Sequence, residues 1–240
     1  MTVITVLIVG FLFGLRHALD ADHVAAVAAL ATRSSSVNET VRMGLAWGLG
    51  HTVTLFIVCA VILFSGISFP QQVANILEFI VGLILVGLGI DVLTRIIRSR
   101  VHVHVHAHRN TGTHIHFHSH EGDENHAIST HEHKHKKLLP RRALLVGLMH
   151  GLAGSAALLL LALGNQISVL HTVSYIIVFG MGSIIGMALL SLTIAWPLMS
   201  TAKFGKINFK IFNVFIGITT TAVGFFVIAK TFPLISVLIA

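Results

Sequence analysis

The sequence predicts an all-α membrane protein with six transmembrane helices in two inverted three-helix repeats, joined by a histidine-rich cytoplasmic loop. Hydrophobic residues make up 55% of the 240 residues and charged residues only 10%, whereas a soluble domain carries about 25% charged residues. Six apolar runs reach the roughly 20 residues that a helix needs to cross a bilayer. Short motifs of the first half also recur, in the same order, in the second half. The partner that this composition indicates is the lipid bilayer, not nucleic acid, because the basic residues behind the net charge of +7 fall in short connections.

The connections between the spans indicate the topology. The six spans are expected near residues 3–31, 42–65, 73–97, 142–164, 171–196 and 209–230. Lysine and arginine follow the first, third and fifth spans, and are missing after the second and fourth. Because basic loops stay in the cytoplasm, we expect a multi-pass protein of a prokaryotic plasma membrane with both termini outside.

An internal repeat is visible in three pairs of segments. The aligned pairs are GLRHALDADHVAAVAAL (14–30) with GLMHGLAGSAALLLLAL (147–163), GLGHTVTLF (48–56) with GMGSIIGMA (180–188), and GLILVGLG (82–89) with GITTTAVG (217–224). With three spans in each repeat, the halves enter the membrane in opposite directions, as in many secondary transporters. The predicted units are therefore residues 1–98, the loop 99–140, and residues 141–240.

The first span contains an unusual group of ionisable residues, RHALDADH at 16–23. One charged residue at the centre of a membrane helix costs roughly 2.5–3.5 kcal/mol, so such residues face inward and have partners. On a regular helix His17, Asp20 and His23 share an arc of about 120°, and Arg16 falls within it. Asp22 would project to the opposite side. It either pairs with another helix or is redirected by local unwinding, and the sequence leaves both open.

Two imidazoles and a carboxylate on one face form a ligand set for nickel, copper, zinc or iron. His51, in the glycine-rich segment WGLGHTV, is expected to face the same site, and His150 is a weaker candidate from the second half. The competing interpretation is a buried salt-bridge network in which Arg16 pairs with Asp20 or Asp22. Arg16 also serves the metal hypothesis, as a supporting charge that balances one aspartate.

The motifs resemble those of a known family. RHALDADHV is similar to the RHAxDADH signature of the nickel/cobalt transporter family (NiCoT), and GLGHTVTLF resembles the glycine-histidine motif of its next helix. This resemblance implies a permease, not an enzyme, that moves nickel(II) or cobalt(II) into the cytoplasm as cargo, with no permanent cofactor. The metal path that it implies comprises His17, Asp20, Asp22, His23 and His51.

The second half departs from the family pattern. It lacks the acidic LGxDTATE-like and GMxxxD-like motifs, and six spans fit this chain better than the usual eight. The chain therefore resembles short relatives, either UreH-type proteins associated with urease or six-span nickel exporters. Export, and a non-transporting accessory role beside urease or hydrogenase maturation proteins, remain alternatives. A metal-dependent intramembrane hydrolase is a further alternative that no HExxH signature supports.

The loop between the third and fourth spans holds twelve of the seventeen histidines, between residues 102 and 135. Alternating histidines cannot form a packed core, so we expect a mobile segment that acts as a metal buffer, capture antenna or sensor. The alternative is a linker that binds metal only incidentally. The auxiliary metal-binding residues expected here are His102, His104, His106, His108, His114, His116, His118 and His120.

Overall fold

The first expected span is not one continuous helix. The structure, a computed structural model, describes residues 3–65, 70–98, 102–108, 112–118, 140–152, 169–203 and 205–236. In it, α1 (Val3–His17) stops in the middle of the run and α2 (Ala21–Ala31) continues after a break. Asp20 has an extended backbone, with φ −61° and ψ 144°, and its carbonyl accepts the first hydrogen bond of α2 from the Val24 amide at 3.0 Å. Aspartate is a preferred residue at this position of a helix start. The helix of the first span is therefore locally unwound between His17 and Ala21, one of the two possibilities that the sequence left open.

Of the remaining helices, α3, α4, α7 and α8 are close to the predicted spans and extend beyond them, whereas α5 covers the start of its span. They are α3 (Val37–Ser65), α4 (Gln71–Arg98), α5 (Arg141–Leu152), α7 (Val169–Lys203) and α8 (Lys206–Ser236). Four of them, α3, α4, α7 and α8, contain stretches long and apolar enough to cross a membrane. The start of α3 shows why a polar sequence joins the helix, because the Ser36 hydroxyl accepts from the Glu39 amide while the Glu39 carboxylate accepts from the Ser35 amide.

The fourth predicted span, 142–164, is only partly described. Helix α5 covers its first part, and residues 153–164 lie outside the described residues. The chain is thus a helical, multi-pass membrane protein, while the count of six spans stays a prediction.

The histidine-rich loop contains a β-hairpin, which an all-α prediction did not include. Strands β1 (His102–His108) and β2 (Gly112–His118) pair antiparallel, with His102 opposite His118, His104 opposite His116 and His106 opposite His114. Alternation of histidine with valine, isoleucine and phenylalanine favours an extended strand. An isolated two-stranded hairpin is of marginal stability in water, so the mobility expected for residues 99–140 stays a prediction.

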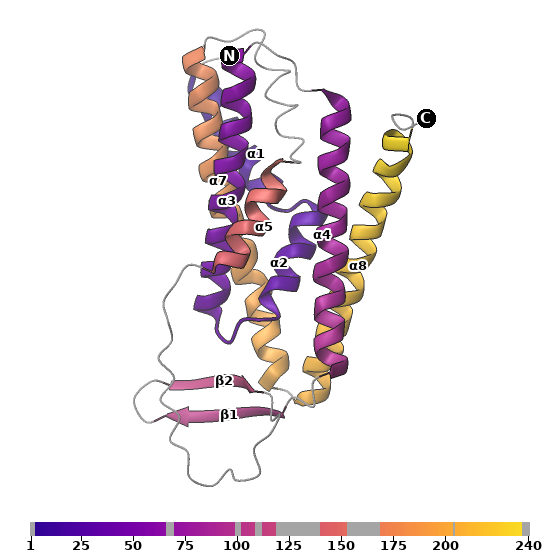
Figure 1. Ribbon diagram of the computed structural model, residues 1–240. Coiled ribbons are helices and arrows are strands. Elements are labelled where there is room, and N and C mark those ends of the chain that lie inside the picture. The colour runs from indigo at the N-terminus through magenta and orange to yellow at the C-terminus, as the bar shows by residue number, and fades with distance from the viewer. Residues whose placement is uncertain are drawn as a thin grey trace.

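The helices pack in pairs, as Figure 1 shows. α1 lies along α7, α3 lies between α5 and α7, and α4 lies along α8. The short α2 packs against α8, α7 and α4, and its small residues Ala25 and Ala26 are buried. Both chain termini lie at the end of the molecule opposite the hairpin.

Glycines make these helix contacts close, and the contacts are reciprocal. A Cβ at Gly14 would meet the backbone of Phe179, and a Cβ at the aligned Gly147 would meet the backbone of Trp47. Phe179 and Trp47 are themselves equivalent positions, because each directly precedes its member of the second pair of segments.

Two further sets of contacts follow the same rule. Gly182 lies against Phe11 and Leu15, and its aligned residue Gly50 lies against the aligned Leu144 and Leu148. On α4 and α8, Gly82 lies against Gly224. The residues aligned with these two, Gly217 and Gly89, also lie against each other. Each of these contacts therefore has a counterpart at the aligned positions of the other half.

Ion pairs join helices at two places. Asp91 pairs with Arg95 at 3.2 Å, as their spacing of one helical turn predicts, and its other oxygen accepts from Arg33 at 2.5 Å. This links the segment after α2 to α4. Lys230 of α8 pairs with Glu78 of α4 at 3.0 Å.

We expect Gly89→Ala to destabilise the protein much more than Gly87→Ala, its matched control on the same helix. A Cβ at Gly89 would meet Thr221 and lie 2.8 Å from the Gly217 carbonyl oxygen, whereas nothing lies within 4 Å of a Cβ at Gly87. Overpacking of this kind costs about 1–3 kcal/mol. Thermal unfolding of the two variants in detergent tests the expectation, and equal melting temperatures would contradict the packing of α4 on α8.

Candidate metal centre

The helix break brings His17 and His23 together. His17 is in the last turn of α1 and His23 in the first turn of α2, and their side chains are buried. In an unbroken helix, residues six positions apart are separated by about 9 Å along the axis. Here the two ring centroids are 4.5 Å apart and the rings meet edge to face. The break is therefore what makes one cluster out of two distant residues.

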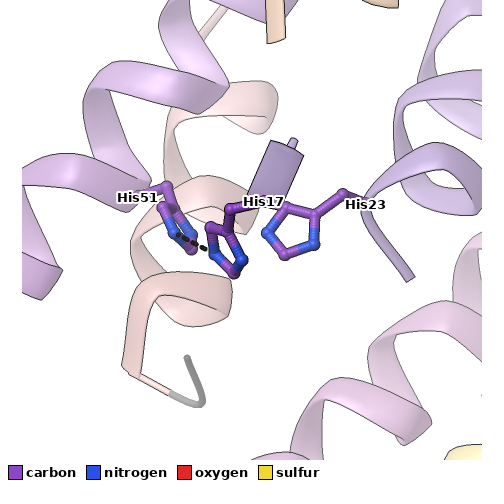
Figure 2. Close-up of side chains that lie close together, drawn as sticks. All are labelled: His17, His23 and His51. Carbon is purple, nitrogen blue, oxygen red and sulfur yellow. Dashed lines mark hydrogen bonds between the residues drawn. The ribbon is translucent and has the colours of Figure 1, made fainter. Parts of the chain in front are cut away.

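His51 of α3 completes a cluster of three imidazoles, shown in Figure 2. Its side chain is 0% exposed, and its ring centroid lies 5.0 Å from that of His17 and 5.1 Å from that of His23. One ring nitrogen of each residue lies within 4.8 Å of the other two, which is close enough for all three to hold one metal ion. We call His17, His23 and His51 the three-histidine cluster.

The distance between His17 and His51 suits metal ligands. Their Nε2 atoms are 3.1 Å apart. Two imidazole nitrogens, each about 2.1 Å from one ion at angles between 90° and tetrahedral, are about 3.0–3.4 Å apart. Without an ion the same distance allows a hydrogen bond between the rings, so the pair is already at the separation that coordination requires.

Two aspartates form hydrogen bonds to the Nδ1 side of two of these rings. His17 Nδ1 donates to Asp20 at 2.8 Å, and His23 Nδ1 donates to Asp22 at 3.0 Å. A neutral imidazole that donates through Nδ1 keeps its free electron pair on Nε2, which is the arrangement that carboxylates impose on metal-binding histidines. His23 Nε2 is buried and has no hydrogen-bond partner. The free nitrogens are thus left for a ligand.

Asp22 links this cluster to α5. Its second oxygen accepts from His150 Nε2 at 2.9 Å, and the His150 side chain is buried. Both outcomes considered for Asp22 therefore occur together, because the backbone unwinds before it and its side chain pairs with another helix. Asp22, His23 and His150 also have ligand atoms within 4.8 Å of one another, and we call them the mixed cluster.

Arg16 does not pair with the aspartates. It is exposed, and no ion pair joins it to Asp20 or Asp22 in the part of the chain that the structure describes. The competing salt-bridge interpretation, and the supporting charge assigned to Arg16, therefore find no contact here, because both carboxylates bond to histidines instead. Asp20, whose side chain is 48% exposed, lies behind His17 and belongs to neither cluster.

Two aromatic residues that we did not single out in the sequence cover the site. The Phe179 ring centroid lies 5.6 Å from that of His17, and the Trp47 centroid lies 5.2 Å from that of His150. These are aligned positions facing aligned histidines. Trp47 could have been found from the sequence, because it precedes His51 by one helical turn and shares its face.

The auxiliary histidines lie away from these clusters in the chain. His102, His104, His106, His108, His114, His116 and His118 are in the two strands of the hairpin, and His120 lies outside the described residues. The hairpin lies outside the helical bundle (Figure 1), whereas the three-histidine cluster is carried by α1, α2 and α3.

The comparison with protein families decides the identity. A family model described as high-affinity nickel-transport protein (NicO) matches residues 3–236. This chain belongs to the NicO family. Its membership confirms the nickel-transporter resemblance and makes the protein a permease for nickel, not an enzyme. The helix break, the buried histidines and both ends of the bundle all fall within the matched residues.

One curated relative and the solved structures complete the comparison. The urease accessory protein UreH of Bacillus sp. (strain TB-90) is 32% identical over 216 residues, which cover 90% of this chain and 86% of the relative. No solved structure matches. The likeness to UreH covers both halves of the NicO protein, including the second half in which the acidic motifs are missing.

We expect Asp22→Ala to lower the melting temperature more than Asp20→Ala. Loss of Asp22 leaves His23 Nδ1 and His150 Nε2 without a partner in buried surroundings, at about 1–3 kcal/mol for each unsatisfied group. Loss of Asp20 removes one bond from a half-exposed carboxylate, where water can replace it. Thermal unfolding without added metal measures the difference. Equal effects would show that Asp22 does not bridge the two histidines.

Proposed function

We propose that this NicO protein imports nickel(II), with cobalt(II) as a second substrate, and that the ion binds at the three-histidine cluster during its passage. The observation that carries the proposal is the meeting of three buried imidazoles with ring nitrogens within 4.8 Å of one another. Imidazole is a preferred ligand of nickel. His23 Nε2 is buried without a partner, at a cost of about 1–3 kcal/mol that a bound ion removes.

The two aspartates supply negative charge and orientation. Moving a hydrated dication into an apolar bundle is costly unless opposite charges accompany it. Asp20 and Asp22 together carry two negative charges and hold His17 and His23 through Nδ1. We assign them mainly this role, which differs from the direct ligation that the sequence motif implied for both. Partners of this kind typically contribute 10–100-fold in metal affinity.

The end of α1 also favours a cation. His17 is in the last turn of α1. The carboxyl end of a helix carries a partial negative charge of roughly half an electron, and transporters use such ends to coordinate cations. His17 therefore lies where a dication is electrostatically favoured.

The reciprocal glycine contacts favour two inverted repeats of three spans. Gly14 and Gly147 make equivalent contacts, as do Gly50 and Gly182. Such contacts are expected if a pseudo-two-fold axis relates the halves, with the second half crossing the membrane in the opposite direction. Rocking of one half against the other would then open the cluster to each side in turn.

Import is the direction that the membrane potential drives. With the cytoplasm negative, two charges gain about 4.6 kcal/mol per 100 mV, which corresponds to a concentration ratio above about 10³. We place the termini outside and the histidine hairpin in the cytoplasm, following the distribution of lysine and arginine. Export is the second candidate, because a histidine-rich segment on the cytoplasmic side would also suit a protein that collects its cargo there.

The cytoplasmic hairpin is proposed to buffer the transported metal. Its register sets three histidines of β1 directly opposite three of β2, and residues directly opposite in antiparallel strands have Cβ atoms about 4.5–5.5 Å apart. Because flexible imidazoles bind any avid divalent metal, the hairpin would hold nickel without selecting it.

The name of the similar protein suggests which proteins receive the transported metal. The similar protein from Bacillus sp. is called a urease accessory protein. We propose that nickel entering through this NicO protein supplies urease or hydrogenase maturation proteins. The non-transporting alternative, an accessory protein that binds nickel and retains it, predicts binding without flux.

We expect His51→Ala to reduce nickel uptake by at least about 100-fold, because losing a ligand should cost more than losing one of the partners that orient it. The measurement is uptake of radioactive nickel into proteoliposomes, with equilibrium dialysis of the purified protein for binding. Asn213→Ala is the control, since Asn213 is buried but donates to Phe209 within its own helix.

Three results would contradict this proposal. They are uptake by His51→Ala equal to that of the wild type, wild-type binding with no flux, and flux that opposes an imposed inside-negative potential. The last result would favour export.

We expect replacement of residues 102–135 by a glycine-serine linker of equal length to leave the maximal uptake rate unchanged. The replacement should change the dependence of uptake on metal concentration, because the buffering histidines are removed while the bundle is intact. Initial rates over a range of nickel concentrations, at constant protein density, measure both quantities. A fall in the maximal rate with unchanged half-saturation would assign the segment to the transport step instead.

A further inference from the structure

His23 occupies a central position between two histidines that occupy aligned places in the two halves. Its ring centroid is 4.5 Å from that of His17 and 4.6 Å from that of His150, and it meets both rings edge to face, at 64° and 73°. His17 and His150 are the aligned histidines of the GL-x-H segments. α1 and α5 approach this region from opposite ends of the molecule (Figure 1).

His23 is also shared by both clusters. The three-histidine cluster offers nitrogen ligands only, whereas the mixed cluster offers the Asp22 carboxylate and two imidazoles. His150 Nδ1 is buried without a hydrogen-bond partner, like His23 Nε2. The mixed cluster therefore contains a buried imidazole nitrogen, His150 Nδ1, whose electron pair is available to bind an ion.

From this geometry we propose that nickel occupies two successive positions, passing from the three-histidine cluster to the mixed cluster while His23 stays bound. The inference rests on the proposed transport function and specifies its central step. His17 and His51 leave the ion as Asp22 and His150 join it. Because His23 belongs to both positions and two dications a few ångströms apart repel strongly, one ion occupies the pair at a time.

The hydrogen bonds permit this exchange with little movement. Asp22 accepts from both His23 and His150, so its two oxygens are already aimed at the two rings that accompany it. Rotation of an imidazole about its outer torsion is soft, which lets His23 turn its free nitrogen from one neighbour toward the other. The same rotation releases the hydrogen bond from His23 Nδ1 to Asp22, and this frees a carboxylate oxygen to join the ion. The handover would move the ion from His17 on α1 to His150 on α5.

The two positions would differ in affinity. Nickel favours imidazole over carboxylate ligands, so exchange of one nitrogen donor for an oxygen donor weakens the second position. A transported ion must leave as well as enter, and a weaker second position favours release. Ser183 stands at the position aligned with His51 and is buried without a partner, so the side of α5 has no equivalent third imidazole from α7.

The test isolates the second position by removing the first. Purified full-length protein in detergent is loaded with nickel, and binding is measured by equilibrium dialysis and coordination by X-ray absorption at the nickel edge. The wild type should show coordination by three imidazoles. His51→Ala should still bind nickel, at least about 100-fold more weakly because a ligand is lost, with fewer imidazoles and added oxygen donors. The double variant His51→Ala, His150→Gln should lose this residual binding, although glutamine can still donate a hydrogen bond to Asp22.

Transport by the single variant His150→Gln completes the experiment. Wild-type nickel affinity combined with at least a 10-fold loss of uptake is expected, because the first position is intact while the second is lost. His51→Asn replaces His51→Ala if the alanine variant elutes as an aggregate, and Asn213→Ala serves again as the control.

The outcomes separate this inference from the proposed function. If the wild type binds and transports nickel but His51→Ala binds none, or the double variant binds as well as His51→Ala, the second position is overturned and transport stands. Normal uptake by His150→Gln would also overturn it. A wild type that neither binds nor moves nickel would overturn both.

Discussion

The structure depends on how a group of ionisable side chains is accommodated in the middle of an apolar bundle. Two aspartates and three histidines cannot face lipid, and a continuous helix would hold His17 and His23 about 9 Å apart along its axis. Interruption of the helix after His17 brings their rings to 4.5 Å and turns Asp22 toward α5. The backbone cost of the break is offset because Asp20 and Asp22 bond to the buried histidines, which would otherwise lack partners on that side.

Close helix packing makes this arrangement possible. Glycines in α1, α3, α5 and α7 allow backbones to touch, as Gly14 does against Phe179 and Gly147 against Trp47. Larger residues would push apart the helices that carry His17, His51 and His150. In lipid, where apolar side chains gain little by leaving the solvent, such contacts are a main source of helix association. The same residues thus set both the stability of the bundle and the distances in the metal centre.

The two halves share their packing but not their chemistry. Aligned glycines make equivalent contacts, and Phe179 and Trp47 cover aligned histidines. Most ionisable ligands come from the first half, whereas the second half contributes His150 and has Ser183 where the first has His51. In the proposed transport cycle, this difference in side chains would give the ion two unlike environments a short distance apart, and a carrier that must bind and then release its cargo needs such a difference.

The sequence by itself determined the membrane class, the approximate helices, the nickel-transporter family and the candidate residues. Composition and the RHALDADH motif carry that information locally, because each depends on the cost of placing particular side chains in lipid. Only the tertiary structure decided which atoms meet. It brought His51 within 3.1 Å of His17, set Asp20 behind a histidine, gave Asp22 a partner on α5 and left Arg16 without either aspartate. An argument from sequence periodicity assumes a regular helix, and it cannot identify contacts between residues 34 or 128 positions apart, such as His17 with His51 or Asp22 with His150. The break at residues 18–20 invalidates the first assumption, and helix packing supplies the missing neighbours.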